Sequence, residues 1–150
     1  MPNLKFHDAG RGISYSPPPD WKMSGRGKML ELIPPQAVQA GARFEVLPTA
    51  PLPADASKVK LFRELAVLLL PAEATNVEII EAGLSELRIS GRPAVEVVLT
   101  YTFFAQQFKM NSLFLPRERE LLRFSFTAHL ADFAPLEKTF RRSLYSLQGL

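Results

Sequence analysis

The chain has 150 residues, 47% of them hydrophobic and 22% charged, and 18 basic residues against 15 acidic ones leave a net charge of +3. This length fits one domain, and so small and evenly mixed a charge does not call for nucleic acid or an anionic lipid surface as a partner. Cysteine is absent, which excludes disulfides, thiolate-bound zinc, iron–sulfur clusters and thiol catalysis. No apolar run approaches the roughly 18 residues that a membrane-spanning helix needs.

The N-terminal third predicts three strands divided by prolines. A short strand around Ile13 and Tyr15 ends at Pro17–Pro19, because three prolines remove three backbone donors and fix φ. Alternation of apolar and polar side chains then predicts strands at 29–33 and 42–48.

The hydrophobic period changes to that of a helix over residues 57–70. Val59, Phe62 and Leu65 recur at helical spacing, and most of the charged residues lie off this stripe. Pro71 follows directly, and because proline cannot continue a helix, the helix is predicted to end there.

The second half predicts strands followed by a helix. Strands are predicted at 76–89, 94–104, 108–115 and 120–127. The closing helix is predicted at 132–147, with Asp132 as its N-cap. Its apolar stripe consists of Phe133, Leu136, Phe140 and Leu144.

The order of these elements defines the expected fold class. Short connections between consecutive strands favour hairpins and an antiparallel sheet, and two amphipathic helices packed on such a sheet give an α+β sandwich. We therefore expect a sheet of about six to seven strands flanked by helices. Residues 1–11 are predicted to be a polar N-terminal tail, and 12–150 a single domain.

Three segments resemble the Mog1/PsbP-like superfamily, which includes bacterial PsbP-related domains. They are the strand at 13–17 with Trp21, the segment SGRPAVEVVLTYTF at 90–103, and RFSFTAHLADFAPLEKTFRRSLYSL at 123–147. The resemblance implies an antiparallel sheet between helices, an α/β/α sandwich. It also implies partner binding in place of a shared active site, and because a fold alone does not license a function, no partner-contacting residue is carried over.

Trp21 is the only tryptophan in the chain and directly follows the proline segment. The resemblance implies that the prolines end an edge strand and steer Trp21 over an open end of the sheet. The alternative is a tryptophan that stacks on a ligand. Packing is the favoured interpretation.

Few residues point to catalysis or metal binding. His129 and Asp132 have the spacing of metal ligands, but a third ligand is missing from the sequence and the role of Asp132 as a helix cap explains the pair. His7 is expected to be solvated. No G-x-S-x-G elbow or phosphate-binding loop occurs. We expect no metal and no cofactor.

Glu96 is the one acidic residue in the predicted strand at 94–104, where it is set among valines. A carboxyl group with a raised pKa would need an apolar environment of this kind. The favoured interpretation is that Glu96 lies on the polar face of the sheet, opposite Arg88 or Arg123.

Basic residues gather in the loop predicted after Trp21. We expect a partner-binding site there, because loops beside rigid sheet ends often carry recognition. Its candidate residues are Trp21, Lys22, Arg26 and Lys28.

Taken together, the sequence predicts a non-catalytic protein-binding or assembly module whose partner and oligomeric state are unknown. One alternative is a cytoplasmic chaperone or adaptor for an exported protein, which predicts an exposed apolar groove. The other is a small-ligand-binding protein, which predicts polar side chains that converge in a pocket. A native N-terminus implies the cytoplasm, and a removed leader implies the periplasm or cell envelope.

Overall fold

The structure is a computed structural model that describes residues 6–8, 13–26, 29–35, 39–48, 58–89, 92–116 and 120–147. In chain order its elements are β1 (Phe6–Asp8), β2 (Ile13–Tyr15), β3 (Lys22–Arg26), β4 (Met29–Ile33), β5 (Gly41–Pro48), α1 (Lys58–Leu68), β6 (Thr75–Ile89), β7 (Arg92–Phe103), β8 (Gln106–Pro116), β9 (Glu120–His129) and α2 (Phe133–Leu144).

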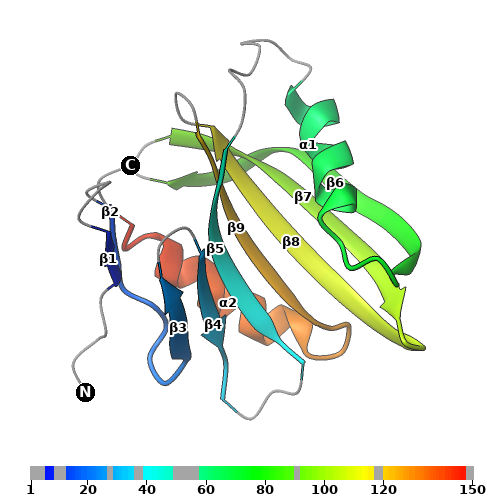
Figure 1. Cartoon of the computed structure of the whole chain (residues 1–150), viewed down its shortest axis with the longest axis horizontal. Helices are drawn as coiled ribbons and strands as arrows, with labels where there is room; N and C mark the ends of the chain where they lie inside the picture. Colours follow the sequence, from blue (N-terminus) through cyan, green and yellow to red (C-terminus); the bar gives the residue numbers. More distant parts are fainter. Residues whose placement is uncertain are drawn as a thin grey trace.

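Seven strands form one antiparallel sheet in the order β3-β4-β5-β9-β8-β7-β6, and β1 and β2 form a separate two-stranded ribbon. The helices α1 and α2 pack against opposite faces of this sheet (Figure 1). The predicted fold class, an α+β sandwich around an antiparallel sheet, is confirmed.

Strand alternation divides the apolar side chains between two cores. On one face, Phe62 of α1 stacks on Phe114 of β8, with ring centroids 5.0 Å apart. On the other face, Phe140 of α2 stacks on Phe126 of β9 at 5.8 Å. Because successive strand residues point to opposite faces, the long strands β7, β8 and β9 contribute to both cores.

Two strands lie where the sequence predicted none. β1 falls within the predicted tail and pairs with β2. β3 occupies the predicted loop after Trp21 and forms the edge of the sheet, paired with β4 from Lys22↔Ile33 to Arg26↔Met29. Its sequence, KMSGR, lacks the alternation that predicts a strand, so its pairing with β4 stabilises a segment that propensity does not favour.

The packing interpretation of Trp21 is confirmed. The indole is only 6% exposed, and its centroid lies 5.9 Å from that of Phe126 in the core beneath α2. Pro17 and Pro18 are buried beside it, and the Trp21 amide donates a hydrogen bond to the Pro18 carbonyl at 3.3 Å. The proline segment therefore ends β2 and directs the indole into the core between α2 and the β3 end of the sheet.

Each helix covers only part of its face. α1 contacts β6 and β7, whereas α2 contacts β9 on the opposite face. In Figure 1, α1 lies over the β6 side of the sheet and α2 lies behind β4, β5 and β9. Consequently neither helix covers the α1 face over β4, β5 and β9 or the α2 face over β6 and β7.

Candidate functional site

A groove lies on each open half-face. The groove on the α1 face, here the Arg123 groove, has a volume of about 480 Å³. The groove on the α2 face, here the Asn111 groove, has a volume of about 460 Å³ and runs between α2 and strands β6 and β7. The positions of the helices on the sheet therefore create both grooves. Each groove is lined by residues of several elements and not by one loop.

The floor of the Arg123 groove holds a buried ion pair. Arg123 is 3% exposed, its Nη1 donates to Glu45 Oε1 at 3.0 Å, and its Nη2 donates to Ser112 Oγ at 3.1 Å. Burial lowers the pKa of Arg123, and the Glu45 carboxylate opposes this effect; the guanidinium remains charged because its ordinary pKa is so high. Within the described residues, Nε of Arg123 has no hydrogen-bond partner.

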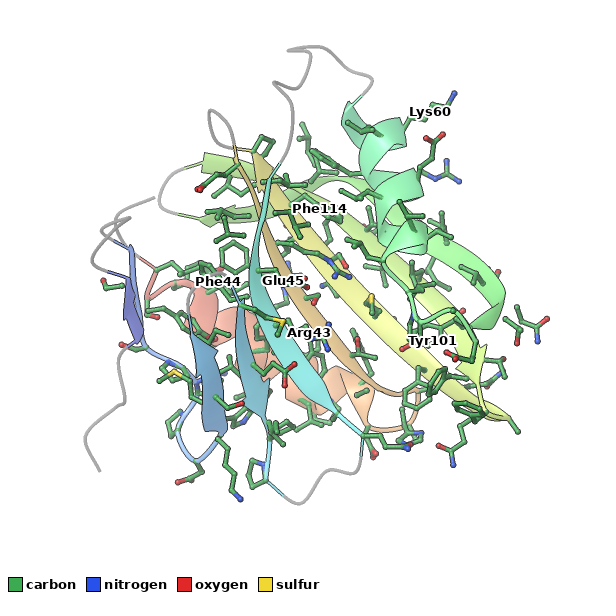
Figure 2. All side chains as sticks on the ribbon, in the orientation of Figure 1. Arg43, Phe44, Glu45, Lys60, Tyr101 and Phe114 are labelled. Atoms are coloured by element: carbon green, nitrogen blue, oxygen red, sulfur yellow. The ribbon has the colours of Figure 1, made fainter. Side chains whose placement is uncertain are left out.

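Strand register explains why these groups meet. Glu45 of β5 is the direct cross-strand neighbour of Arg123 on β9, and Arg43 lies two residues earlier on the same face of β5. Arg43 in turn pairs with Glu31 of β4 at 3.3 Å. Figure 2 labels Arg43 and Glu45 on β5 and Tyr101 on β7, around the half-face that α1 leaves open.

The Asn111 groove holds a second polar cluster. Phe133, Glu137 and Arg141 recur every four residues and form the stripe of α2 that borders this groove. The Arg141 guanidinium donates to Glu96 Oε2 on β7 and lies 3.7 Å from Glu137 Oε2. Asn111 of β8 donates through Nδ2 to Glu96 Oε2 at 2.6 Å and to Glu137 Oε2 at 3.3 Å.

Burial and neighbouring charges shift the pKa values of two residues in this cluster. Burial raises the pKa of Glu137, and Arg141 opposes this effect only in part. Burial, the largest single cause, would lower the pKa of Arg141, but the charge and hydrogen bond of Glu96 together with the charge of Glu137 outweigh it, so the pKa is raised. Asn111 is 4% exposed, and its Oδ1 has no partner in the part of the chain that the structure describes.

Of the two partners expected for Glu96, Arg123 was wrong. Glu96 is paired in register with Leu113, and Leu113 with Phe124, so Glu96 shares the face of Phe124. Arg123 is the next residue along β9 and therefore faces the other side. Glu96 binds Arg141 of the helix instead, and the side chain of Arg88 lies outside the described residues.

The described residues of the predicted partner-binding loop do not lie in one loop. Trp21 is in the core, whereas Lys22 is exposed at the start of the edge strand β3. Arg26 ends the same strand, and Lys28 lies outside the described residues. The use of this edge by a partner stays a prediction.

The histidine-containing segments have structural positions. His129 stacks on Phe108 with centroids 4.5 Å apart, and Asp132 is the N-cap residue of α2, although its side chain accepts no capping hydrogen bond. His7 lies in β1. Across the described ranges, no group of three or more histidine, cysteine or acidic residues is placed to hold a metal ion.

Sequence reasoning missed both grooves, although it carried a partial signal for each. Glu137 and Arg141 have the four-residue spacing of a helical ion pair. Asn111 and Arg123 are polar residues within strongly apolar strands, which is typical of buried and paired side chains. The sequence did not provide the position of each helix on its sheet face, and that position determines where each groove lies.

Comparison with known proteins identifies the fold. No family model matches the chain, and no curated protein matches it. Several solved structures match. The Ran-binding protein Mog1p of Saccharomyces cerevisiae has a TM-score of 0.63 at 10% identity, over 99% of this chain and 95% of that one. Cyanobacterial PsbP of Synechocystis gives 0.61 at 10%, over 97% and 91%.

A third match is LpqN, involved in cell envelope biogenesis of Mycobacterium tuberculosis, with a TM-score of 0.63 at 13% identity over 98% of this chain and 90% of that one. The chain spans 48% of another matched structure, from Bacteroides thetaiotaomicron. The architecture is thus an α+β sandwich with half-covered sheet faces. More specifically, it is the Mog1/PsbP-like fold, as the resemblance implied. Neither of the two described helices is long and apolar enough to cross a membrane.

Proposed function

We propose that this protein is a non-catalytic protein-binding module whose partners contact the half-faces of the sheet that α1 and α2 leave open. The observation that carries this proposal is the pair of grooves of about 480 and 460 Å³ on opposite faces. Both are open to solvent along one side, which suits a segment of another protein.

The state of the charged groups supports a binding role over a catalytic one. Arg123 is held by Glu45, and Glu96 is held by Arg141 and Asn111. A general base or nucleophile must be free to exchange a proton or a bond with a substrate, whereas carboxylates bound by guanidinium groups are fixed as charges. One matched fold neighbour is a Ran-binding protein, which is consistent with protein partners.

The alternatives from the sequence make different demands on the grooves. A chaperone for an exported protein predicts an exposed apolar groove, but the floor of the Arg123 groove carries a guanidinium and hydroxyl groups between apolar walls. A small-ligand-binding protein is favoured by one observation, the polar side chains of Arg43, Arg123 and Thr127 that line the same groove. It remains the second candidate.

Site-specific photo-crosslinking in cells of the source organism tests the proposal. The crosslinker p-benzoylphenylalanine replaces Arg43, at the rim of the Arg123 groove, or Leu84, at the rim of the Asn111 groove. Phe104, equally exposed in the turn between β7 and β8, is the control position outside both grooves. We expect a discrete crosslinked protein from a groove position. A protein captured at Arg43 should, when purified, bind wild-type protein and lose affinity for the Arg43→Glu variant.

Two results would contradict the proposal. In one, the control position captures the same proteins as the groove positions. In the other, the groove positions capture none, and native mass spectrometry of the purified protein shows a stoichiometric small molecule. The latter result would favour the small-ligand alternative.

A further inference from the structure

We infer that the outer edge of β6 is a docking site for an extended segment of a partner protein that carries lysine or arginine at alternate positions. The segment adds to the seven-stranded sheet as one further strand beside β6. The inference goes beyond the proposed function, because it concerns the rim of the sheet and its backbone groups, whereas the proposed function concerns the grooves on the two faces.

β6 lacks most of the features that usually block an open sheet edge. It has 15 residues, against five in β3 at the opposite edge, and its sequence TNVEIIEAGLSELRI contains neither lysine nor proline. Natural proteins block such edges with short strands, with lysine and proline, and with β-bulges. β6 has register shifts on either side of Glu81–Leu84, but this stretch pairs regularly with β7, from Glu81↔Val98 to Leu84↔Val95. A regular section of open edge therefore remains between the two irregular ones.

The β7–β8 hairpin determines which residues of β7 bond to β6. Phe103 and Gln106 pair across a two-residue turn, and such a pair exchanges both of its backbone hydrogen bonds. Along an antiparallel strand, successive residues direct their backbone groups alternately to one neighbouring strand and to the other. The odd-numbered residues of β7 therefore bond to β8, and the even-numbered ones, Glu96 and Val98 among them, bond to β6.

This alternation leaves the backbone groups of two β6 residues pointing outward. The register partners of Glu96 and Val98 are Gly83 and Glu81, whose N–H and C=O groups consequently point toward β7. The residues that alternate with these are Ala82 and Leu84, and their N–H and C=O groups point away from the sheet. Among the described residues, no backbone hydrogen bond from another element reaches them. Such groups supply the affinity when a peptide adds to a sheet edge.

The side chains of the same strand select the charge of the incoming segment. Glu78 and Glu81 are exposed, and their register partners Thr100 and Val98 place both on the α2 face. Neither carboxylate forms an ion pair with a described residue. On the same face, a Cβ atom built at Gly83 would have no other atom within 4 Å. The space beside Glu81 thus admits a basic side chain from a neighbouring strand.

A second copy of the chain does not fit this edge. The whole of β6 contains three glutamates and one arginine, a formal charge of −2. Two copies paired through β6 would bring these charges together, and like charges across a strand pair are destabilising. A segment with a cation at every second position instead places its charges beside the carboxylates. Its apolar residues can cover Ile80 and Leu84, which are 54% and 73% exposed.

Amide hydrogen exchange of the full chain, followed by NMR, tests this edge. The probe is the peptide acetyl-Thr-Lys-Val-Lys-Val-Lys-Thr-amide. One counterpart has glutamate in place of lysine, and the other has N-methylated valines, whose amides would bond to β6. In the free protein we expect the amides of Ala82 and Leu84 to exchange faster than those of Glu81 and Gly83. The lysine peptide at millimolar concentration should slow the two fast amides about tenfold, and neither counterpart should.

Matched variants separate the backbone contribution from the charge. Ala82→Pro removes one outward N–H group, which an edge strand tolerates, and should weaken the lysine peptide about tenfold. Ala82→Ser keeps this N–H group and should bind as wild type does. Glu81→Gln should weaken the peptide about threefold. Asp20→Asn changes the net charge equally but lies next to β3, at the opposite edge of the sheet, and should leave the affinity unchanged.

Several results would overturn the inference. If the amides of Ala82 and Leu84 are as protected as that of Glu81 in the free protein, the edge is already covered. If their protection rises with protein concentration alone, the occupant is a second copy. Equal binding of the lysine and glutamate peptides removes the selection for basic residues. Equal binding of the N-methylated peptide removes strand addition, and this comparison on wild-type protein decides the question even if Ala82→Pro does not fold.

The outcomes are separate from those of the proposed function. Arg43 lines the groove on the α1 face, on the strand β5. A partner captured at Arg43 that binds Ala82→Pro and wild type equally, together with a lysine peptide that protects no amide, retains the proposed function and removes the edge site. Peptide protection of Ala82 and Leu84 without a crosslinked protein at either groove retains the edge site and removes the proposed groove function.

Discussion

Arg123 and Glu45 form the most deeply buried ion pair among the described residues, with side chains 3% and 13% exposed. Arg43 and Glu31 form a pair on the same face that is much more accessible, at 53% and 37%. Removing one partner of a buried pair leaves an uncompensated charge, whereas a surface pair contributes little. Comparison of these two ion pairs therefore tests how burial changes the contribution of an ion pair to stability.

We predict that Glu45→Gln lowers the free energy of unfolding by about 3 kcal/mol, because the buried Arg123 guanidinium loses its counter-charge. Glu31→Gln should lower it by about 0.5 kcal/mol. Urea denaturation of both variants at pH 7, followed by circular dichroism, measures the difference. Equal losses in the two variants would show that burial does not determine the strength of these pairs.

At this scale the sequence predicted the alternation but not the partners. The two-residue period of the predicted strand at 120–127 puts Arg123 and Ser125 on the face opposite that of Phe124, as found. The sequence could not provide the register that sets Glu45 beside Arg123, or the helix position that brings Arg141 to Glu96. Those contacts join residues far apart in the chain, and local sequence carries no record of them.

Among the elements, β3 is a strand that its own sequence does not predict and that pairs with β4 alone among the described residues. Gly25, near its end, has φ of +99°, and a Cβ atom built there would lie 2.5 Å from the Met29 carbonyl oxygen. Gly83 in the edge strand β6 has no atom within 4 Å of such a position. These two strand glycines differ in whether a side chain fits.

Gly25→Ala is expected to destabilise the protein by about 2 kcal/mol, through backbone strain and the clash with the β4 carbonyl. Gly83→Ala should be neutral or raise the free energy of unfolding by about 0.5 kcal/mol, because alanine restricts the unfolded chain. Thermal unfolding of both variants provides the comparison. A Gly25→Ala protein as stable as wild type would contradict the conformation of the β3–β4 hairpin.

Element prediction succeeded where a pattern was long. The strands β7, β8 and β9 and both helices lie within a few residues of their predicted bounds, because ten or more residues share one period. β1 has three residues, too few to display a period, and the five residues of β3, KMSGR, lack the alternation that predicted the equally short β4. Both form because a neighbouring strand supplies hydrogen bonds.

At the scale of the whole molecule, the two ends of the described chain are held together. Ser143 Oγ donates to the Phe140 carbonyl, so the Tyr15 hydroxyl donates to Ser143 Oγ at 2.6 Å, across 128 residues of sequence. The Ser16 amide donates to Ser146 Oγ at 2.8 Å. Burial raises the pKa of Tyr15 despite its bond to Ser143. Trp21, a few residues after Ser16, packs on Phe126 in the core beneath α2 and so also holds the N-terminal segment to the sheet.

Trp21→Ala should therefore lower the free energy of unfolding by about 3–5 kcal/mol, because a large cavity opens between the sheet end and α2. Tyr145→Ala removes an aromatic ring that is 72% exposed and should change stability by less than about 0.5 kcal/mol. Urea denaturation followed by far-ultraviolet circular dichroism compares them. A small loss for Trp21→Ala would contradict its place in the core.

The hairpin of β8 and β9 supplies the polar side chain at the base of each groove, Asn111 from one strand and Arg123 from the other. A slip of one residue in the pairing of these strands would turn one strand over relative to the other. An amide or a guanidinium group would then stand among phenylalanines, and one groove would lose its polar base. Correct pairing of this single hairpin is thus a precondition for the polar base of both grooves at once.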